Sequence, residues 1–401
     1  PRYNARDAAI YLAALHKSKV LLGSATPSLE TYFNTQIEKY GYVSLNERYL
    51  NTPMPRIEIA NMKEDYINKR NYSIFSSLLY DRIIQTLNNH KQVIIFKNQR
   101  GYASNIRCEV CGWVAKCPNC DVSLTYHKQW NSLNCHYCGL NLPLYSECPE
   151  CHSHSLVQSG NGSEKIEEEI LRFFPNARVK RMDLDTTRKK NDYLEIIQDF
   201  EKGNIDILCG TQIITKGLDF SNVGLVGVID ADSLLYYPDF RAYERCFDLL
   251  TQVAGRAGRL KEKGAVVIQS FNPNHQIFKE VLNYDYASMY KNQIVERKLF
   301  SYPPFVYLTK ILFQSKDKDV LDSLCQEYSN EIRKIFAQRI LGPEYPPIYR
   351  VKGMYQKQFI LKLEKTISYT QAKKLIMQLN EEILSKKEYK QVRVIVDVDT
   401  Y

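Results

Sequence analysis

The sequence of 401 residues contains no apolar run of 18 residues and no signal peptide. A helix that crosses a bilayer needs about 20 predominantly apolar residues, so we expect no contact with a membrane. The lack of an export signal favours a cytoplasmic protein. Because the chain begins with Pro1 and not with methionine, we also expect that further residues precede it.

The sequence also lacks the phosphate-binding loop Gly-x-x-x-x-Gly-Lys-Ser/Thr. That loop holds the phosphates of a nucleotide, and its hydroxyl group binds the accompanying magnesium ion. We therefore expect that these residues alone do not hydrolyse ATP.

Positive charge is only moderately in excess, with a formal net charge of +9. This excess is compatible with a nucleic-acid partner but does not establish one. Hydrophobic residues make up 44% of the chain and aromatic residues 12%, which suffices for the cores of about two to four domains.

The cysteines carry the strongest chemical signal in the sequence. Eight of the eleven form four Cys-x-x-Cys pairs: Cys108/Cys111, Cys117/Cys120, Cys135/Cys138 and Cys148/Cys151. A gap of two residues lets a tight turn aim both sulfur atoms at one ion, and two such pairs complete a tetrahedral zinc site. Residues 108–151 are therefore predicted to bind two zinc ions. Disulfide bonds are disfavoured because the chain has no export signal.

Spacing alone leaves the grouping of these pairs open. If consecutive pairs shared an ion, the first two pairs would form one zinc site and the last two pairs the other. Nested pairs would group Cys108, Cys111, Cys148 and Cys151 as site 1 and Cys117, Cys120, Cys135 and Cys138 as site 2. Nesting suits an insertion, because it returns the chain to the point of departure. His127, His136, His152 or His154 could replace a cysteine, although eight thiolates already satisfy two ions.

Apolar runs elsewhere predict an α/β sheet. Residues 205–209 form a buried strand that ends at Gly210-Thr211-Gln212, and residues 223–229 are continuously apolar, as in a parallel strand covered on both faces. The latter strand ends at Asp230-Ala231-Asp232, the position where ligands gather in open α/β sheets. Residues 92–96 and 264–269 are further strands, and residues 76–88 and 243–253 are helices.

Both ends of the chain extend this pattern. Residues 5–16 are predicted as a helix, residues 19–22 as a buried strand, and Ser28 as the cap of another helix. Beyond a break at residues 272–274, strands at 306–313, 359–363 and 392–398 alternate with helices at 320–336 and 369–384. This order predicts an α+β domain. Basic and aromatic residues of this domain could stack on bases and contact phosphates of single-stranded DNA, or could simply form a solvated basic loop. They are Arg350, Lys352, Tyr355, Lys357 and Lys362.

Four strings resemble motifs of superfamily 2 helicases. Residues 23–28 (Gly-Ser-Ala-Thr-Pro-Ser) resemble motif III, residues 98–103 motif IV, residues 210–220 motif V and residues 252–259 motif VI. With the eight-cysteine insertion between motifs IV and V, nearly the whole chain resembles the replication-restart helicases of the primosomal protein N′ family.

This resemblance implies a fold and a division into domains. Residues 1–50 would end a first RecA-like lobe, and residues 51–107 and 152–271 would form the second lobe. Residues 108–151 would be the zinc-binding insertion, and residues 272–401 the C-terminal α+β domain. The phosphate-binding loop and the acidic magnesium-binding segment would lie upstream.

The resemblance also implies roles for single residues. Arg256 and Arg259 would act catalytically on the γ-phosphate of ATP, as two guanidinium groups near a transferring phosphoryl group can. Nucleotide binding and its coupling to DNA would involve Gln252, Gly217, Asp219, Ser24 and Thr26. The DNA backbone would be contacted by Thr211, Lys216 and Arg100.

The function implied is an ATP-dependent, magnesium-dependent 3′-5′ DNA helicase or translocase that recognises stalled or repaired forks and initiates primosome assembly. Its implied partners are forks, D-loops, single-stranded DNA, single-strand binding protein and other primosome proteins. The alternative is a zinc-dependent DNA- or protein-binding module with a RecA-like scaffold that hydrolyses nothing.

Overall fold

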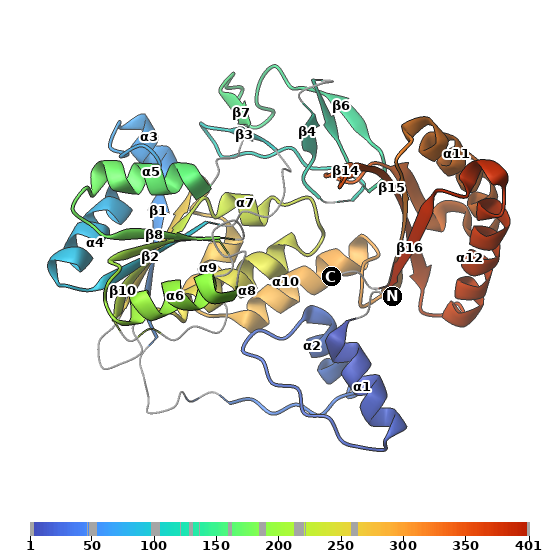
Figure 1. Cartoon of the computed structure of the whole chain (residues 1–401), viewed down its shortest axis with the longest axis horizontal. Helices are drawn as coiled ribbons and strands as arrows, with labels where there is room; N and C mark the ends of the chain where they lie inside the picture. The colour runs from blue at the N-terminus through green and yellow to red at the C-terminus, as the bar shows by residue number, and fades with distance from the viewer. Residues whose placement is uncertain are drawn as a thin grey trace.

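The computed structural model describes residues 4–45, 47, 54–97, 105–120, 122–127, 131–135, 137–158, 163–183, 190–211, 220, 222–257 and 264–398. Two bodies built on β-sheets flank a cysteine-rich module, and helices α1 and α2 lie below them in the view of Figure 1. None of the described helices combines the length and the apolar composition that crossing a bilayer requires.

The larger body contains a six-stranded sheet with the order β1-β11-β10-β2-β9-β8, in which all neighbouring strands are parallel. Its strands are β1 (Arg56–Asn61), β2 (Gln92–Lys97), β8 (Val179–Met182), β9 (Ile207–Gly210), β10 (Val223–Ile229) and β11 (Ala265–Ser270). Its helices are α3 (Met62–Ile67), α4 (Ser77–Asn88), α5 (Ser163–Phe173), α6 (Lys190–Glu201), α7 (Asp232–Leu235), α8 (Ala242–Ala254), α9 (Gln276–Leu282) and α10 (Tyr286–Leu299). The predicted α/β sheet is therefore confirmed.

Strand β10 has an apolar cluster on each face. Val226 and Val228 belong to the cluster that also includes residues of α6, α8, α9 and α10. Leu225 and Ile229 belong to the opposite cluster, together with residues of α4 and α5. This two-sided burial explains the continuous apolar run and confirms the prediction made from it.

The N-terminal segment consists of α1 (Ala5–Leu15) and α2 (Leu29–Gln36). Ser28 caps α2 by accepting a hydrogen bond from the backbone N–H of Thr31, as predicted. The predicted strand at residues 19–22 is wrong, because this stretch is irregular and the side chain of Leu21 is 97% exposed. An apolar run forms a buried strand only where other strands satisfy its backbone hydrogen bonds. None of the six strands of the described sheet pairs with residues 19–22.

The cysteine-rich module leaves and rejoins the larger body through a pair of antiparallel strands, β3 (Ile106–Cys108) and β7 (Leu156–Gln158). Within it, β4 (Thr125–His127), β5 (Ser132–Asn134) and β6 (Asn141–Pro143) form a small antiparallel sheet. The two ends of the insertion therefore lie side by side.

The C-terminal body contains an antiparallel sheet with helices on one face. Its strands are β12 (Val306–Ser315), β13 (Ile340–Glu344), β14 (Arg350–Val351), β15 (Met354–Glu364) and β16 (Arg393–Val398), and its helices are α11 (Lys318–Phe336) and α12 (Tyr369–Leu384). The predicted α+β character is confirmed. Strands β13 and β14 were not predicted from the sequence.

Candidate metal centres and motif residues

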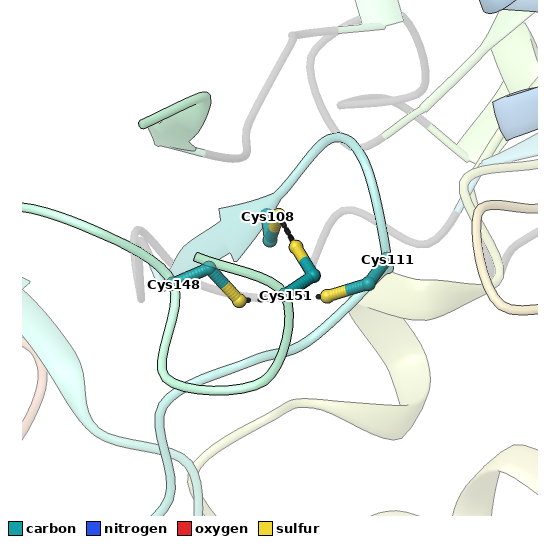
Figure 2. Close-up of side chains that lie close together, drawn as sticks. All are labelled: Cys108, Cys111, Cys148 and Cys151. Atoms are coloured by element: carbon teal, nitrogen blue, oxygen red, sulfur yellow. Dashed lines mark hydrogen bonds between the residues drawn. The ribbon is translucent and has the colours of Figure 1, made fainter. Parts of the chain in front are cut away.

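The structure gathers the eight cysteines into two groups of four. Site 1 contains Cys108, Cys111, Cys148 and Cys151 (Figure 2), and site 2 contains Cys117, Cys120, Cys135 and Cys138. In each group the sulfur atoms all lie within 4.8 Å of one another. The grouping is the nested one.

The spacing of the sulfur atoms fits zinc and not disulfide bonds. The Sγ atoms of Cys111 and Cys148 lie 3.4 Å apart, and those of Cys117 and Cys138 lie 3.6 Å apart. A disulfide bond would require about 2.05 Å. Four sulfurs at about 2.3 Å from a tetrahedral zinc ion lie about 3.8 Å from each other, so each group fits one ion.

Glycines close the turns that aim these sulfurs. Gly112 and Gly139 both have φ +81°, a left-handed conformation that glycine adopts without steric cost. The backbone N–H of Gly112 donates to the carbonyl oxygen of Cys108, and that of Gly139 to Cys135, each at 3.0 Å. Each turn thereby points two cysteines toward one centre.

Two of the candidate histidines are engaged elsewhere. His152 lies 3.5 Å from Glu147, and the Nδ1 atom of His154 lies 3.0 Å from the carbonyl oxygen of Ser146. Within the described part of the chain, both metal-binding groups consist of cysteines alone. The ring of His127 and all of His136 lie outside the described residues.

The module is packed against both larger bodies, a feature that was not predicted from the sequence. Its apolar core includes Phe240 from the larger body. It also includes Tyr302, which precedes β12, and Leu308 and Ile360, which lie on β12 and β15 of the C-terminal sheet. A Cβ atom at Gly139 would lie 2.5 Å from the carboxylate of Glu344 on β13. The module is therefore part of a shared core and not a separate bead.

Arg107, on β3, anchors the module to the strand ends of the larger sheet. Its guanidinium group lies 3.6 Å from the centroid of the Phe271 ring and 3.9 Å from the carboxylate of Asp230. Burial raises the pKa of Asp230 to about 6, and the charge of Arg107 opposes this shift. The buried Asp232 accepts hydrogen bonds from the Ser270 hydroxyl and the Phe271 N–H, both at 2.9 Å. Asp230 therefore faces Arg107 directly, whereas Asp232 fixes the backbone of Phe271, whose ring Arg107 contacts.

Two of the motif residues lie at the C-terminal end of α8. Gln252 is exposed in its last turn, and Arg256 follows in a turn where its N–H donates to the carbonyl oxygen of Val253. Thr211 directly follows β9. The remaining predicted site residues of the strings at 98–103, 210–220 and 252–259 lie outside the described residues: Arg100, Lys216, Gly217, Asp219 and Arg259.

The segment that resembles motif III faces α8. The Ser24 hydroxyl accepts a hydrogen bond of 3.1 Å from the N–H of Thr26. Thr26 lines a cavity of about 340 Å³ together with Arg6, Glu244 and Asp248. Burial, with the nearby charge of Glu244, raises the pKa of Asp248 to about 8, whereas a hydrogen bond with Thr26 opposes the shift. Asp248 lies one turn before Gln252, so this cavity adjoins the helix end that carries Gln252 and Arg256.

Comparison with known families identifies three parts of the chain. Residues 117–143 match the PriA DNA helicase Cys-rich region domain, residues 153–261 the helicase conserved C-terminal domain, and residues 298–401 the primosomal protein N C-terminal domain.

Individual proteins align along the whole chain. The replication restart protein PriA of Bacillus subtilis is 39% identical over 403 residues, which cover 100% of this chain and 50% of that protein. The PriA protein of Borreliella burgdorferi is 36% identical and covers 96% of this chain, with 57% of its own length aligned. This chain thus spans about half the length of these relatives. A solved structure of yeast Dbp5 with RNA and ADP BeF3 covers 73% of this chain and 59% of its own, at 12% identity and a TM-score of 0.35, which is too low to support an inference.

These relatives align with all or nearly all of the chain. The three family domains follow one another along the chain as the cysteine-rich module, a part of the larger body, and the C-terminal body. The chain belongs to the PriA family of replication restart proteins.

Proposed function

We propose that the complete protein is an ATP-dependent 3′-5′ DNA helicase or translocase that recognises stalled or repaired forks and initiates primosome assembly. The observation that carries this proposal is the insertion of two nested four-cysteine centres into a parallel sheet whose helix α8 leads to Gln252 and Arg256. Membership of a replication restart family supports it.

In this proposal residues 1–50 end the first lobe, residues 51–107 and 152–271 form the second, residues 108–151 are the zinc-binding insertion, and residues 272–401 are the C-terminal domain. ATP and magnesium bind in the cleft between the lobes, with further ligands supplied by upstream residues. Arg256 and Arg259 then stabilise the charge of the transferring phosphoryl group.

The other motif residues connect the nucleotide to the DNA. Gln252 positions the nucleotide, and the coupling residues are Gly217, Asp219, Ser24 and Thr26. The DNA backbone is contacted by Thr211, Lys216 and Arg100. The protein acts in the cytoplasm on forks, D-loops and single-stranded DNA, with single-strand binding protein and other primosome proteins as partners.

Arg256 provides the test in the complete protein. We expect Arg256→Ala to lower DNA-stimulated ATP hydrolysis by about 10³-fold or more, because such an arginine acts on transition-state charge. Nucleotide affinity should change little. The matched control is Arg172→Ala on α5, whose side chain is 70% exposed and which should leave turnover unchanged.

Two results would contradict the proposal. Unchanged turnover of the Arg256→Ala protein would remove this residue from the site. A complete protein that binds forked DNA without any DNA-stimulated ATP hydrolysis would instead favour the non-hydrolytic binding module.

The 401 residues alone should show no turnover, because they contain no phosphate-binding loop.

A further inference from the structure

Site 2 is connected to the C-terminal body by Tyr302. The Tyr302 hydroxyl donates a hydrogen bond of 2.9 Å to the carbonyl oxygen of Cys120, a member of site 2. The ammonium group of Lys362 lies 3.8 Å from the centroid of the same ring and donates to the carbonyl oxygen of Phe300 at 2.7 Å. Tyr302 is only 3% exposed, so its ring and hydroxyl have little freedom to move.

Tyr302 is in turn stacked on Phe240, which precedes helix α8. The ring centroids lie 4.3 Å apart with an interplanar angle of 4°. The guanidinium groups of Arg241 and Arg297 lie 4.3 Å and 5.1 Å from the centroid of Phe240. A cation close to an aromatic face is attracted more strongly when both groups are removed from water, as here.

The two arginines hold helix α2. Arg241 lies 2.9 Å and Arg297 3.0 Å from the carboxylate of Glu30 on α2. Arg297 also pairs with Glu244 on α8 at 2.5 Å, and Glu244 accepts a hydrogen bond of 2.8 Å from the first N–H of α2, that of Leu29.

These charges are buried, so they depend on one another. Arg241, Glu244 and Arg297 are each at most 4% exposed. Removing one partner of such a group leaves another charge buried and unpaired, which is strongly destabilising. Burial would raise the pKa of Glu30, but Arg241 and Arg297 outweigh it and hold that pKa below its usual value. The docking of α2 therefore depends on the position of both arginines.

Site 1 has different surroundings. Its residue Cys108 follows Arg107, which contacts Asp230 and Phe271 at the strand ends of the larger sheet. The Cβ of a residue at Gly112, next to Cys111, would lie 3.1 Å from the carbonyl oxygen of Phe271. The two metal centres therefore face different parts of the molecule, and site 2 is the one that contacts Tyr302.

We propose that Tyr302, Phe240 and Arg297 are positioning residues that couple the metal centre of site 2 to the docking of helix α2 on helix α8. Helix α2 directly follows residues 23–28, and α8 leads to Gln252 and Arg256. One consequence rests on the proposed function. If residues 23–28 couple the nucleotide to the DNA, a change in site 2 reaches these residues through the docking of α2. Because coupling between two sites is reciprocal, the docking of α2 also affects the order of site 2.

The test compares one ligand from each metal centre in the complete, zinc-loaded protein. Cys138 in site 2 and Cys151 in site 1 are both partly exposed. With Cys138→Ser we expect hydrogen exchange of the backbone amides of α2, residues 29–36, to accelerate about tenfold. With Cys151→Ser exchange in α2 should stay unchanged. No acceleration in Cys138→Ser, or equal acceleration in both variants, would overturn the proposal.

Two conservative variants keep the test decisive if Cys138→Ser does not fold. Tyr302→Phe retains the ring but loses the hydrogen bond to Cys120, and should accelerate exchange in α2 about two- to tenfold, the range expected for one buried hydrogen bond. Glu30→Gln should in turn accelerate exchange in the site 2 turn, residues 117–120, but not in the site 1 turn, residues 108–112. Unchanged exchange of α2 in Tyr302→Phe and of residues 117–120 in Glu30→Gln would overturn the coupling.

Hydrogen exchange needs neither ATP nor DNA, so this test separates the coupling from the proposed function. If the complete protein showed no DNA-stimulated hydrolysis, the helicase proposal would fail, while the exchange data would still decide whether site 2 and α2 are coupled.

Discussion

The role of a single side chain depends on its neighbours more than on its residue type. The basic cluster of the C-terminal domain illustrates this. Lys362 is enclosed against Tyr302, and burial lowers its pKa to about 8. Lys357 pairs with Asp322 at 2.6 Å, whereas Arg350 and Lys352 are exposed. These residues look alike in the sequence, but Lys362 and Lys357 are engaged by neighbours, and the guanidinium group of the exposed Arg350 lies 4.8 Å from the centroid of the Tyr355 ring.

His275 allows a prediction about pH. It caps α9 through its Nδ1 atom, which accepts from the N–H of Ile277, and its ring packs against Tyr243 and Phe278. Burial, aided by the charge of Lys116, lowers its pKa from 6.5 to about 4. The unfolded chain therefore binds the proton more tightly than the folded one. The contribution of neutral His275 to stability is complete above pH 6.5 and is lost as the pH falls toward 4.

We expect this residue to account for about 1–2 kcal/mol of the stability lost between pH 7 and pH 5. The measurement is the free energy of unfolding at both pH values. His275→Asn is the matched variant, because asparagine can cap the helix but does not titrate. If wild type and variant lost the same stability over this range, His275 would not be the titrating group.

At the scale of elements, strands and helices differ in how well their own residues predict them. Strand β10 was predicted because a run buried on both faces is continuously apolar. The run at residues 19–22 has a similar composition but forms no strand, since strand formation depends on partners that four residues cannot specify. Helix α2 was predictable because its cap, Ser28, is adjacent in sequence. The adjacent cap and the continuous apolar run of β10 were therefore sufficient signals, whereas the short run at residues 19–22 was not.

The glycines of β10 permit a test of how closely helix α4 packs on the sheet. A Cβ atom at Gly227 would lie 2.8 Å from methyl carbons of Ile95 and Leu79, closer than such atoms can approach. We expect Gly227→Ala to lower the free energy of unfolding by about 1–3 kcal/mol, as overpacking of a core does. Chemical denaturation measures this change.

Gly41→Ala is the control for this substitution, because its added Cβ would have no atom within 4 Å. It should change the free energy of unfolding by less than about 0.5 kcal/mol. Equal stability of the Gly227→Ala protein and the wild type would show that α4 does not pack this closely on β10.

At the scale of the whole molecule, the cysteine pairs were evident from spacing, but their grouping required the fold. Strands β3 and β7 bring together residues that lie about 50 positions apart, and this pairing makes the nested arrangement possible. The docking of the module was not predictable, because Cys120 meets Tyr302 across 182 positions of sequence. No local pattern in the sequence indicated that the rings of Phe240 and Tyr302 stack.

The shared core leads to a last prediction, about metal removal. Elemental analysis of the zinc-loaded protein should give two zinc ions per chain, since each group of four cysteines fits one ion. Structural zinc contributes directly to folding free energy. Because Leu308 and Ile360 of the C-terminal sheet are buried in the same core as site 2, a chelator should destabilise this sheet as well as the module.

Burial of one such side chain is worth about 1.5–3 kcal/mol, so exposing both should lower the melting temperature by roughly 5–15 °C. Hydrogen exchange of β12 and β15 should accelerate at the same time, and added zinc should reverse both changes. An independently folded module would behave differently: chelation would unfold residues 108–151 and leave the melting and exchange of the C-terminal sheet unchanged. That result, or a content of one zinc or none, would contradict the shared core with two metal centres that the contacts of Tyr302, Leu308 and Ile360 indicate.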